Sequence, residues 1–388
     1  MKASPVTAMT AAAAAPRSAS RATPGVHHYE YVFPDQAMYV YDVNHGERLV
    51  QKVELPDIDG IRGVVASPRT RTLYISHGGD GGGNGDGALL AYDLLDNKVL
   101  WDRQYGRGID APAITNDGSR IYLPDGELSP DGIWTVIDAH TGAVTGTIRA
   151  GAGAHNTLIG LSGKRVYLGG RNYRYLDVAS TATNRIVKRV GPLISGVRPF
   201  TVNGRETLAY TTATGFLGFQ VSSLVTGHVL YTTTFGPRFR WNPTTFAPTA
   251  PSHGISLSPN QRQLWVIDGP NSYVHVFDVS GLPRRAPRRI ADIKLSEPLT
   301  GAESGCRYDC TRDGWLQHSR NGCLVFVGDS GDVLSTMTFK RVAFLPALRN
   351  TRKFLEVDWR GGIPVATTSM HGLGYVTHGR LPAPATCR

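Results

Sequence analysis

Short β-rich runs, rather than helical stripes, dominate the pattern of apolar and polar positions along the chain. Gly, Pro, Asp and Asn turns separate these runs, as is typical of strands that follow one another closely. One unit recurs at intervals of about 40 to 60 residues, near the length of a four-stranded blade. The second-strand copies of this unit are LYISHG, IYLPDG, VYLGGR, LAYTTA, LWVIDG, VFVGDSG and PVATTS.

The repeat predicts an all-β fold, a seven-bladed β-propeller formed by residues 26–380. Ala37–Leu55 has the pattern of outer strands without inner ones, and Phe354–Gly372 that of inner strands without outer ones. We therefore expect the two ends to share one blade, which closes the ring and removes its open sheet edges. The pattern leaves open whether Tyr39–Val43 or Leu373–Thr377 supplies the third strand of that blade.

Composition adds a basic balance, with 41 Lys and Arg against 31 Asp and Glu, for a formal charge of +10. Such a balance permits anionic ligands, nucleic acid or acidic surfaces as partners. No apolar run reaches the length of a transmembrane helix, so we expect no membrane partner. Residues 1–25, rich in Ala, Ser and Pro, are expected to be disordered or a remnant export segment, and residues 381–388 a C-terminal tail.

The four cysteines are Cys306, Cys310, Cys323 and Cys387. An even number in a loop-rich chain predicts one or two disulfides, with Cys306 joined to Cys310 or Cys323, and an oxidising, periplasmic or secreted location. A zinc site is the alternative, although the Cys-x3-Cys spacing has no second matching pair.

Two repeats, TNDGSRIYLPDG with WTVIDAHTGAVTGTI and LSPNQRQLWVIDGPNSYVHVFDVSG, resemble those of YVTN/YncE-like seven-bladed propellers. The resemblance covers most of residues 37–380. Related propellers include the quinoprotein amine dehydrogenase heavy chain, a nucleic-acid-binding periplasmic family, lactonases and virginiamycin-type lyases. The resemblance implies the fold but does not choose a reaction, because one fold hosts unrelated chemistries.

In a propeller, the start of each inner strand and the end of each second strand open onto the same mouth of the axial channel. Alignment of the copies gives the inner-strand entries as Arg62, Asp110, His155, Arg198, His253, Gly314 and Lys353. The second-strand exits are His77, Asp125, Arg171, Thr212, Asp268, Asp329 and His371. His318 follows Gly314 by four residues, an even spacing that places both residues on the same face of the strand. So many ionisable residues at matching positions predict a functional site at this mouth.

Two chemistries fit this set of residues. Neutral imidazoles converging on the axis could hold copper, zinc or iron, and otherwise no cofactor is expected. The candidate metal ligands are His77, His155, His253, His318 and His371. The alternative for each histidine is a hydrogen-bonded place in the core, and for Asp125, Asp268 and Asp329 a turn-capping role.

The second chemistry needs no metal. Arg62 and Arg198 could clamp the carboxylate or phosphate of a small anionic molecule. Such a substrate would also meet Arg171, Lys353 and Trp241. His155 and His253, with Asp110, would then serve as catalytic acid and base. This arrangement suits a lyase, an isomerase or a lactonase.

Two long connections, Gly236–Pro251 and Ser296–Asp313, are expected over the same mouth and are candidate binding loops. Phe239, Arg240 and Trp241 in the first are the hint for another function, a non-catalytic scaffold that binds a protein partner or single-stranded nucleic acid. The chain has no P-loop, no G-x-G-x-x-G after a strand, no G-x-S-x-G and no H-E-x-x-H. These absences disfavour nucleotide-dependent chemistry, serine hydrolysis and zincin proteolysis.

Overall fold

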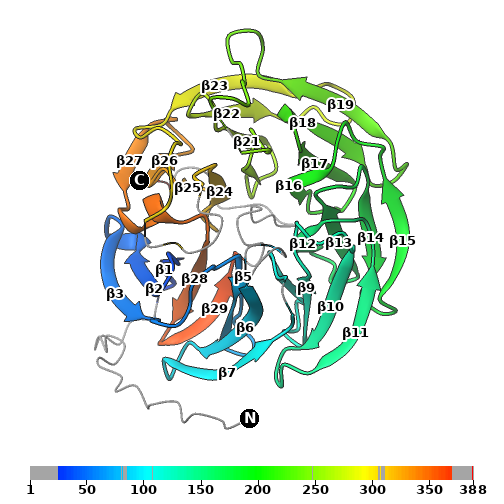
Figure 1. The fold of residues 1–388 in the computed structure, drawn as a ribbon. Coiled ribbons are helices and arrows are strands. Elements are labelled where there is room, and N and C mark those ends of the chain that lie inside the picture. Colours follow the sequence, from blue (N-terminus) through cyan, green and yellow to red (C-terminus); the bar gives the residue numbers. More distant parts are fainter. Residues whose placement is uncertain are drawn as a thin grey trace.

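The seven sheets of the protein stand radially around a central axis, like blades (Figure 1). The computed structural model describes residues 25–79, 81, 85–106, 108–246, 248–304, 306, 311–368 and 387. Within these residues the helical structure is confined to two short 3-10 helices, η1 (Val43–His45) and η2 (Ala347–Asn350). The described part of the chain has no helix that is both long and apolar enough to cross a membrane.

The first three blades along the chain are antiparallel sheets of four strands, in which each strand pairs with the next in sequence. Blade I consists of β4 (Gly63–Ser67), β5 (Thr72–Gly79), β6 (Gly85–Asp93) and β7 (Lys98–Gln104). Blade II consists of β8 (Ala113–Ile114), β9 (Arg120–Pro124), β10 (Ile133–Asp138) and β11 (Val144–Arg149). Blade III consists of β12 (Ala154–Ile159), β13 (Arg165–Gly170), β14 (Leu176–Ser180) and β15 (Arg185–Val190).

The next three blades repeat this order, with the innermost strand first. Blade IV consists of β16 (Val197–Val202), β17 (Leu208–Ala213), β18 (Phe216–Ser223) and β19 (Val229–Thr234). Blade V consists of β20 (Ile255–Leu257), β21 (Gln263–Asp268), β22 (Tyr273–Asp278) and β23 (Arg288–Lys294). Blade VI consists of β24 (Trp315–His318), β25 (Leu324–Gly328), β26 (Asp332–Ser335) and β27 (Arg341–Phe344). The predicted seven-bladed propeller is therefore confirmed.

Blade VII joins the two ends of the fold, as predicted (Figure 1). Its strands are β1 (His27–Val32), β2 (Ala37–Asp42), β3 (Arg48–Glu54), β28 (Phe354–Arg360) and β29 (Ile363–Thr367). They lie in the order β29-β28-β1-β2-β3, so the third strand counted outward from β28 is β2.

One detail of that prediction is wrong. The PVATTS segment is not the second strand of blade VII, because β29 pairs on the inner side of β28 and β1 takes the second position. The sequence HHYEYV of β1 was missed because its polar residues hide a strand whose Glu30 is fully buried.

The core lies between neighbouring blades, because successive residues of a strand face opposite sides of its sheet. On β28, Phe354 belongs to the same apolar cluster as Phe326 of blade VI, whereas Leu355 belongs to the same cluster as Ile75 of blade I. Phe354 and Leu355 are both fully buried. Burial of each side chain stabilises the fold by roughly 1.5–3 kcal/mol. The outermost strands face solvent, which leaves Val99 about half exposed.

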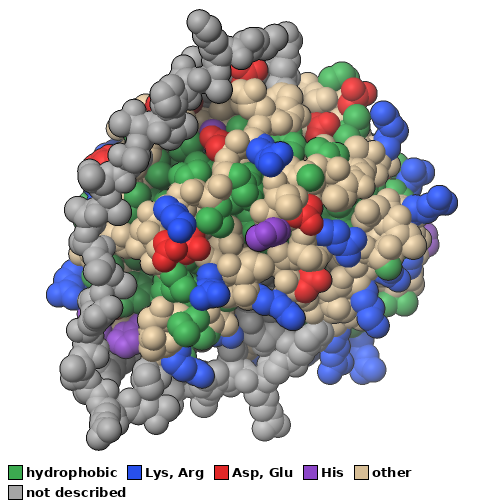
Figure 2. All heavy atoms as spheres, turned by 90° about the horizontal axis from the view of Figure 1, so that it is seen from below, with side chains coloured by type: hydrophobic (Ala, Val, Ile, Leu, Met, Phe, Trp, Pro, Cys, Tyr) green, Lys and Arg blue, Asp and Glu red, His purple; other side chains and the backbone are tan. Residues whose placement is uncertain are grey.

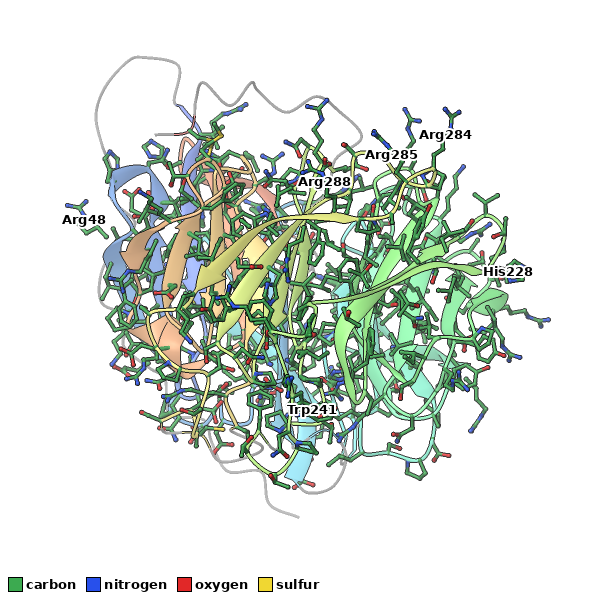
Figure 3. The ribbon with its side chains drawn as sticks, turned by 90° about the horizontal axis from the view of Figure 1, so that it is seen from above. Arg48, His228, Trp241, Arg284, Arg285 and Arg288 are labelled. Carbon is green, nitrogen blue, oxygen red and sulfur yellow. A yellow bond between two sulfur atoms is a disulfide. The ribbon has the colours of Figure 1, made fainter. Side chains whose placement is uncertain are left out.

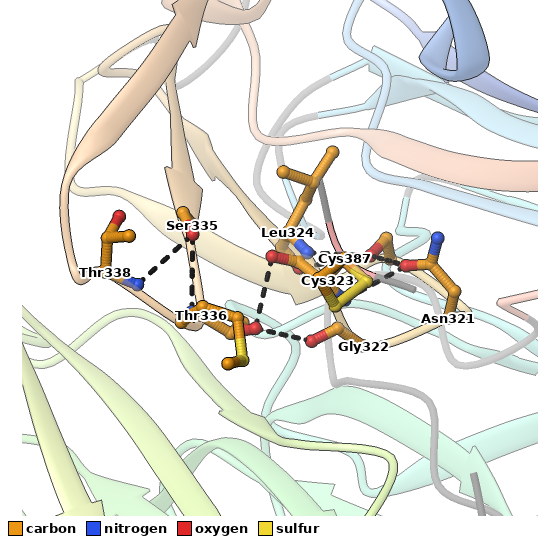
Figure 4. The surroundings of a disulfide bond; sticks show 10 residues. Asn321, Gly322, Cys323, Leu324, Ser335, Thr336, Thr338 and Cys387 are labelled. Carbon is orange, nitrogen blue, oxygen red and sulfur yellow. Dashed lines mark hydrogen bonds between the residues drawn. A yellow bond between two sulfur atoms is a disulfide. The ribbon is translucent and has the colours of Figure 1, made fainter. Parts of the chain in front are cut away.

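Two of the four cysteines form a disulfide between Cys323 and Cys387, with 5.2 Å between their Cα atoms (Figure 4). Cys306 is also disulfide-bonded. The predicted use of cysteines in disulfides is confirmed. The alternatives of a Cys306–Cys323 bridge and of a zinc site are wrong, because Cys323 is bonded to Cys387 and its sulfur is no longer a thiolate.

Candidate functional site

A small, partly open cavity of about 20 Å³ lies where the inner strands begin. It has room for roughly one water molecule. Its lining consists of Arg62, Asp110, Ala111, Glu127, His155, Asn156, Arg198, His253, Asp313, Trp315, Arg352 and Lys353. The predicted inner-strand entries therefore come together around one cavity, except Gly314, whose carbonyl accepts a hydrogen bond from His253.

His155 and Asp110 form a buried carboxylate–histidine pair in this cavity. The Nδ1 of His155, at the start of β12, donates to Oδ2 of Asp110 over 2.7 Å. Nη2 of Arg62 lies 3.6 Å from the same oxygen. Burial would raise the pKa of Asp110, but the nearby His155 and Arg62 outweigh it and hold the pKa below its ordinary value. Nε2 of His155 is buried and has no hydrogen-bond partner among the described residues.

A second pair of the same kind faces the first. Nδ1 of His253 lies 3.1 Å from Oδ1 of Asp313, which also accepts from Nη1 of Arg352 at 2.5 Å. Burial lowers the pKa of His253, although Asp313 opposes this shift, so the ring is neutral near pH 7. The ring centroids of His155 and His253 are 6.3 Å apart. Two imidazoles, each oriented by a carboxylate, therefore stand close together in one cavity.

Glu127 is one of the charged lining residues that sequence analysis missed, together with Asp313 and Arg352. Its Oε1 accepts from Nη2 of Arg62 at 2.9 Å, and its Oε2 from Nη1 of Arg198 at 2.5 Å. Nη1 of Arg171 is 3.1 Å from the same Oε2. Burial opposes ionisation, but Arg198, His155 and Arg62 lower the pKa of Glu127 well below its ordinary value. The predicted Arg62–Arg198 clamp therefore closes on the protein's own carboxylate.

The signal for Glu127 was present in the sequence. Glu127 follows the end of β9 by three residues, and Gly126 between them has a φ of 111°. This left-handed conformation, which glycine adopts without strain, is part of a tight turn beside the cavity. The alignment assigned the site position to Asp125, which instead accepts a hydrogen bond from Thr135.

Lys353 and Trp315 complete the wall beside His253. Nζ of Lys353 lies 5.5 Å from the centre of the Trp315 ring, and the ring of His253 is 5.1 Å from the same indole. Burial, together with the positive charges of Arg352 and Arg62, lowers the pKa of Lys353 to about 8. Lys353 is therefore an acid that can lose its proton only slightly above neutral pH.

Most second-strand exits do not line the cavity. Nε2 of His77 is 3.0 Å from Oδ1 of Asp102 on the outer strand β7, and Thr212 donates to the carbonyl of Pro199. Asp268 accepts from the side chains of Asn271 and His275. The second strand is one strand removed from the axis, so most of its side chains face neighbouring blades. Two second-strand exits contact lining residues without lining the cavity themselves. Arg171 forms an ion pair with Glu127, and Asp329 accepts hydrogen bonds from the backbone N–H groups of Asp313 and Gly314.

The predicted five-histidine set is not assembled. His318 is fully buried, with Nδ1 2.7 Å from the hydroxyl of Ser256 and its ring against Trp265. Its four-residue offset from Gly314 moves it roughly 13 Å along the channel. Burial lowers its pKa to about 3. His371 lies outside the described residues, so His155 and His253 are the predicted ligands that the described structure brings together.

Trp241 does not line the cavity either. It belongs to the long connection after β19, and its Nε1 donates to the carbonyl of Phe246. Figure 3 shows it at the opposite end of the disc from Arg284, Arg285 and Arg288. This position agrees with the prediction that the long connection lies at the mouth end. It does not agree with the prediction that Trp241 contacts a ligand in the cavity.

Asp110, Glu127 and His155 place potential metal-ligand atoms within 4.8 Å of one another. However, both oxygens of Glu127 already accept guanidinium hydrogen bonds. A metal ion at this point would lie next to the positive charges of Arg62 and Arg198. The residues present therefore suit a small anion better than a metal ion.

No family model and no curated protein sequence matches this chain. Among solved structures it is similar to Kuenenia stuttgartiensis hydrazine synthase, with a TM-score of 0.53 and 16% sequence identity. The match covers 72% of this chain and 77% of that one. At this identity the likeness shows the fold alone. In all, 1583 chains of solved structures match, and a fold used so widely does not choose a function.

Proposed function

We propose that the axial cavity binds a small monoanionic molecule and catalyses a proton transfer on it, with His155 as general base. The observation that carries this proposal is the buried Asp110–His155 pair, whose Nε2 is unpartnered among the described residues. A carboxylate on Nδ1 fixes the tautomer, so that Nε2 presents a lone pair. This is the arrangement that a histidine base needs.

The charge of the lining favours an anionic substrate. Arg62, Arg198, Arg352 and Lys353 are set against Asp110, Glu127 and Asp313. Counted over the lining alone, these four cations and three carboxylates leave one positive charge when the histidines are neutral. Behind the lining, Nε of Arg352 also lies 3.6 Å from Asp329 and 3.3 Å from Glu303. All seven side chains are buried, where an unbalanced charge interacts more strongly than in water. One bound carboxylate would neutralise the lining. The cavity has room for roughly one water molecule, so a ligand with several heavy atoms can enter only if lining side chains such as Glu127 move.

The proton transfer follows from the two sides of the cavity. Nε2 of His155 takes a proton from the substrate, and the imidazolium that forms is stabilised by Asp110. Lys353, with a pKa of about 8, is protonated near neutral pH and can return a proton to the substrate. Solvent then carries the proton from His155 back to Lys353. The net reaction is an isomerisation or an elimination next to the anionic group, without an oxidant or reductant.

Formate and acetate test the binding step, with formamide and acetamide as neutral controls of similar shape. We expect calorimetry to detect the two anions and not the amides, and the affinity to fall at least about tenfold in Arg198→Gln, which removes one charge. Equal binding of anions and amides would overturn the proposal.

The catalytic step is tested by proton NMR in D2O with a panel of two- to four-carbon 2-oxo and 2-hydroxy carboxylates. We expect enzyme-dependent loss of the signal of a carbon-bound proton, on C3 of the oxo acids or C2 of the hydroxy acids, at a rate reduced about 100-fold or more in His155→Gln. Anion binding without exchange of any panel member would reduce the function to binding alone. Elemental analysis is the companion measurement, because a stoichiometric copper, zinc or iron lost in His155→Ala/His253→Ala would contradict the anion site.

A groove on blade V favours a second candidate, binding of single-stranded nucleic acid or an acidic protein. Lys294 and Arg238 lie 4.7 and 6.0 Å from the ring centre of Tyr273, and Arg289 lines the same groove. Cations interleaved with aromatic rings suit stacked bases and phosphates. Against it, Asp292 also lines the groove. On the edge of the disc that Figure 2 shows, which is the side away from blade V, basic side chains are spread among acidic ones and do not form one patch. Binding of an oligonucleotide that weakens steeply with salt would support this candidate.

We also propose a periplasmic or secreted location. The Cys323–Cys387 disulfide supports it, because such bonds persist in oxidising compartments. Fractionation of the native producer should recover the protein outside the cytosol, and recovery in the cytosol with free thiols would contradict it.

A further inference from the structure

A second cluster of ionisable side chains lies in blade VII, where the first strand of the fold meets the last long one. β1 and β28 are antiparallel, with His28 opposite Asp358 and Glu30 opposite Glu356. Alternate residues of a strand share a face, so all four side chains lie on the same side of the sheet. Directly opposite residues have Cβ atoms about 4.5–5.5 Å apart. We call these four residues the seam cluster.

The seam cluster is held together by hydrogen bonds and is covered by blade VI. Nδ1 of His28 lies 2.7 Å from Oδ1 of Asp358 and 2.9 Å from Oε1 of Glu356. Arg320, in the turn after β24, donates its backbone N–H to Oε2 of Glu356 and its Nη1 to Oδ2 of Asp358. The side chains of Glu356 and Asp358 are buried, whereas that of His28 is 19% exposed. The cluster therefore has an opening to solvent on the His28 side.

Glu30 is the residue that these contacts leave unexplained. It is fully buried, and neither of its carboxylate oxygens has a hydrogen-bond partner among the described residues. Burial and the nearby Glu356 raise its pKa well above the ordinary value. A buried carboxylate without a donor costs roughly 1–3 kcal/mol or more. A cation placed between Glu30 and its neighbours would remove this cost.

We propose that the seam cluster is a binding site for a divalent transition-metal ion of the zinc type, with His28, Glu30, Glu356 and Asp358 as ligands. The ligand atoms of His28, Glu356 and Asp358 already lie within 4.8 Å of one another. One imidazole with carboxylates is a donor set that zinc uses, whereas calcium and magnesium prefer oxygen ligands alone. Arg320, bonded to the outer oxygens of two ligands, would orient them from the second layer.

The consequence of this site is closure of the ring. His28 and Glu356 are 328 residues apart in sequence, so the ion would bridge almost the whole chain. A metal ion that joins distant segments is stabilising because the unfolded chain cannot hold its ligands together.

Zinc binding to the chelator-treated full-length protein tests the proposal. We expect calorimetry to show one equivalent of zinc bound at this site. At a 100-fold excess over Kd, the thermal midpoint should rise by about 2–5 °C. The same titration in the His155→Ala/His253→Ala variant should still show this equivalent, which separates the seam cluster from the axial cavity.

Three variants assign the ligands. Glu30→Gln should weaken zinc binding about 100-fold while leaving the midpoint of the metal-free protein equal or higher, a combination that a merely structural role would not give. His28→Ala should abolish binding, and His45→Ala, which removes an exposed histidine paired with Asp42, should change nothing. Absence of binding at 100-micromolar zinc (roughly the weak limit for a built site), or unchanged binding in Glu30→Gln and His28→Ala, would overturn the proposal.

Discussion

The axial cavity and the seam cluster both hold buried carboxyl groups beside histidine, but they differ in the number of cations that stand next to those carboxyl groups. In the cavity every carboxylate has a guanidinium within reach, because Arg62 lies between Glu127 and Asp110, Arg198 bonds Glu127, and Arg352 bonds Asp313. Counting Lys353, the lining holds one cation too many. In the seam cluster three carboxylates share one histidine and one arginine, and Glu30 has neither.

This difference teaches which kind of ligand each site is built to receive. A buried excess of charge is stabilised by a partner of opposite sign. On this ground we propose a small anion as the ligand of the cavity and a cation as the ligand of the seam cluster. Burial and residue type alone would have grouped the two together, since both contain histidine and carboxylates. The number and placement of the arginines separate them.

The largest expected effect comes from removing the carboxylate at the centre of the cavity. Glu127→Ala would leave Arg62 and Arg198 buried without their partner, at a cost of about 3–5 kcal/mol in the free energy of unfolding. Urea unfolding measures it, with the exposed Asp131→Ala in the same connection as a near-neutral control. Formate should restore more stability to Glu127→Ala than to the wild type. A decrease in the free energy of unfolding of less than about 1 kcal/mol would contradict the comparison, because the stability of the cavity would then not depend on paired charges.

The next largest effect concerns the disulfide that ties Cys387 to blade VI, close in sequence to Arg320. Its removal in Cys323→Ser/Cys387→Ser should lower the free energy of unfolding by about 2–4 kcal/mol, since the bridge closes a loop of 64 residues. Differential scanning calorimetry with and without zinc measures it. If the seam cluster stabilises the ring independently of the disulfide, the zinc-induced rise of the thermal midpoint should persist in this variant. Loss of this rise would show that zinc binding at the seam cluster depends on the disulfide.

A smaller effect of opposite sign, a gain in stability, is expected when the positive charge of Lys353 is removed from the cavity. Burial first, then Arg352 and Arg62, lower the pKa of Lys353 from 10.5 to about 8. Between these pH values the unfolded chain binds more protons than the folded protein, so this residue makes stability rise with pH across pH 8–10.5. Lys353→Met should flatten that rise and add about 1–3 kcal/mol at pH 7. Urea midpoints from pH 6 to 10 check it, and an unchanged slope would count against a surplus charge.

The smallest effect is expected at the rim of the cavity. Arg171 is partly exposed and is the third guanidinium on Glu127, which keeps Arg62 and Arg198 without it. Arg171→Gln should therefore cost less than about 1 kcal/mol. Comparison of its urea midpoint with that of the exposed Arg149→Gln measures the difference. A cost as large as that of Glu127→Ala would mean that the rim, not the buried pairs, balances the cavity.

Sequence periodicity was sufficient to predict the propeller, its shared blade and most of the cavity. Arg62, Asp110, His155, Arg198, His253 and Lys353 line one cavity because each stands at the same point of a repeated unit. Register in a repeat protein is a strong constraint, since every copy places the same position at the same distance from the axis. What it could not give was the direction of second-strand side chains such as His77, which faces Asp102 on the outer strand.

The partners of these residues were harder to predict, for physical reasons. Glu127 reaches the cavity from a turn outside the repeated strands, where no periodicity applies. Asp313 and Arg352 lie one residue before the positions that the alignment marked, and their pairing depends on two different blades. Glu30 gives no sequence signal at all, because a buried unpaired carboxylate looks like an ordinary exposed position of a strand.

Blade VII also sets an order of events during synthesis. Its β1, β2 and β3 leave the ribosome first, yet their inner neighbour β28 is made only after the other six blades. Until then the inner edge of β1 has unpaired backbone groups and Glu30 has no strand opposite it. A polar, charged β1 is less prone than an apolar strand to pair with another nascent chain during this interval. Glu30, whose burial costs free energy in the finished ring, thus belongs to a strand whose polar residues reduce wrong pairing before β28 is made.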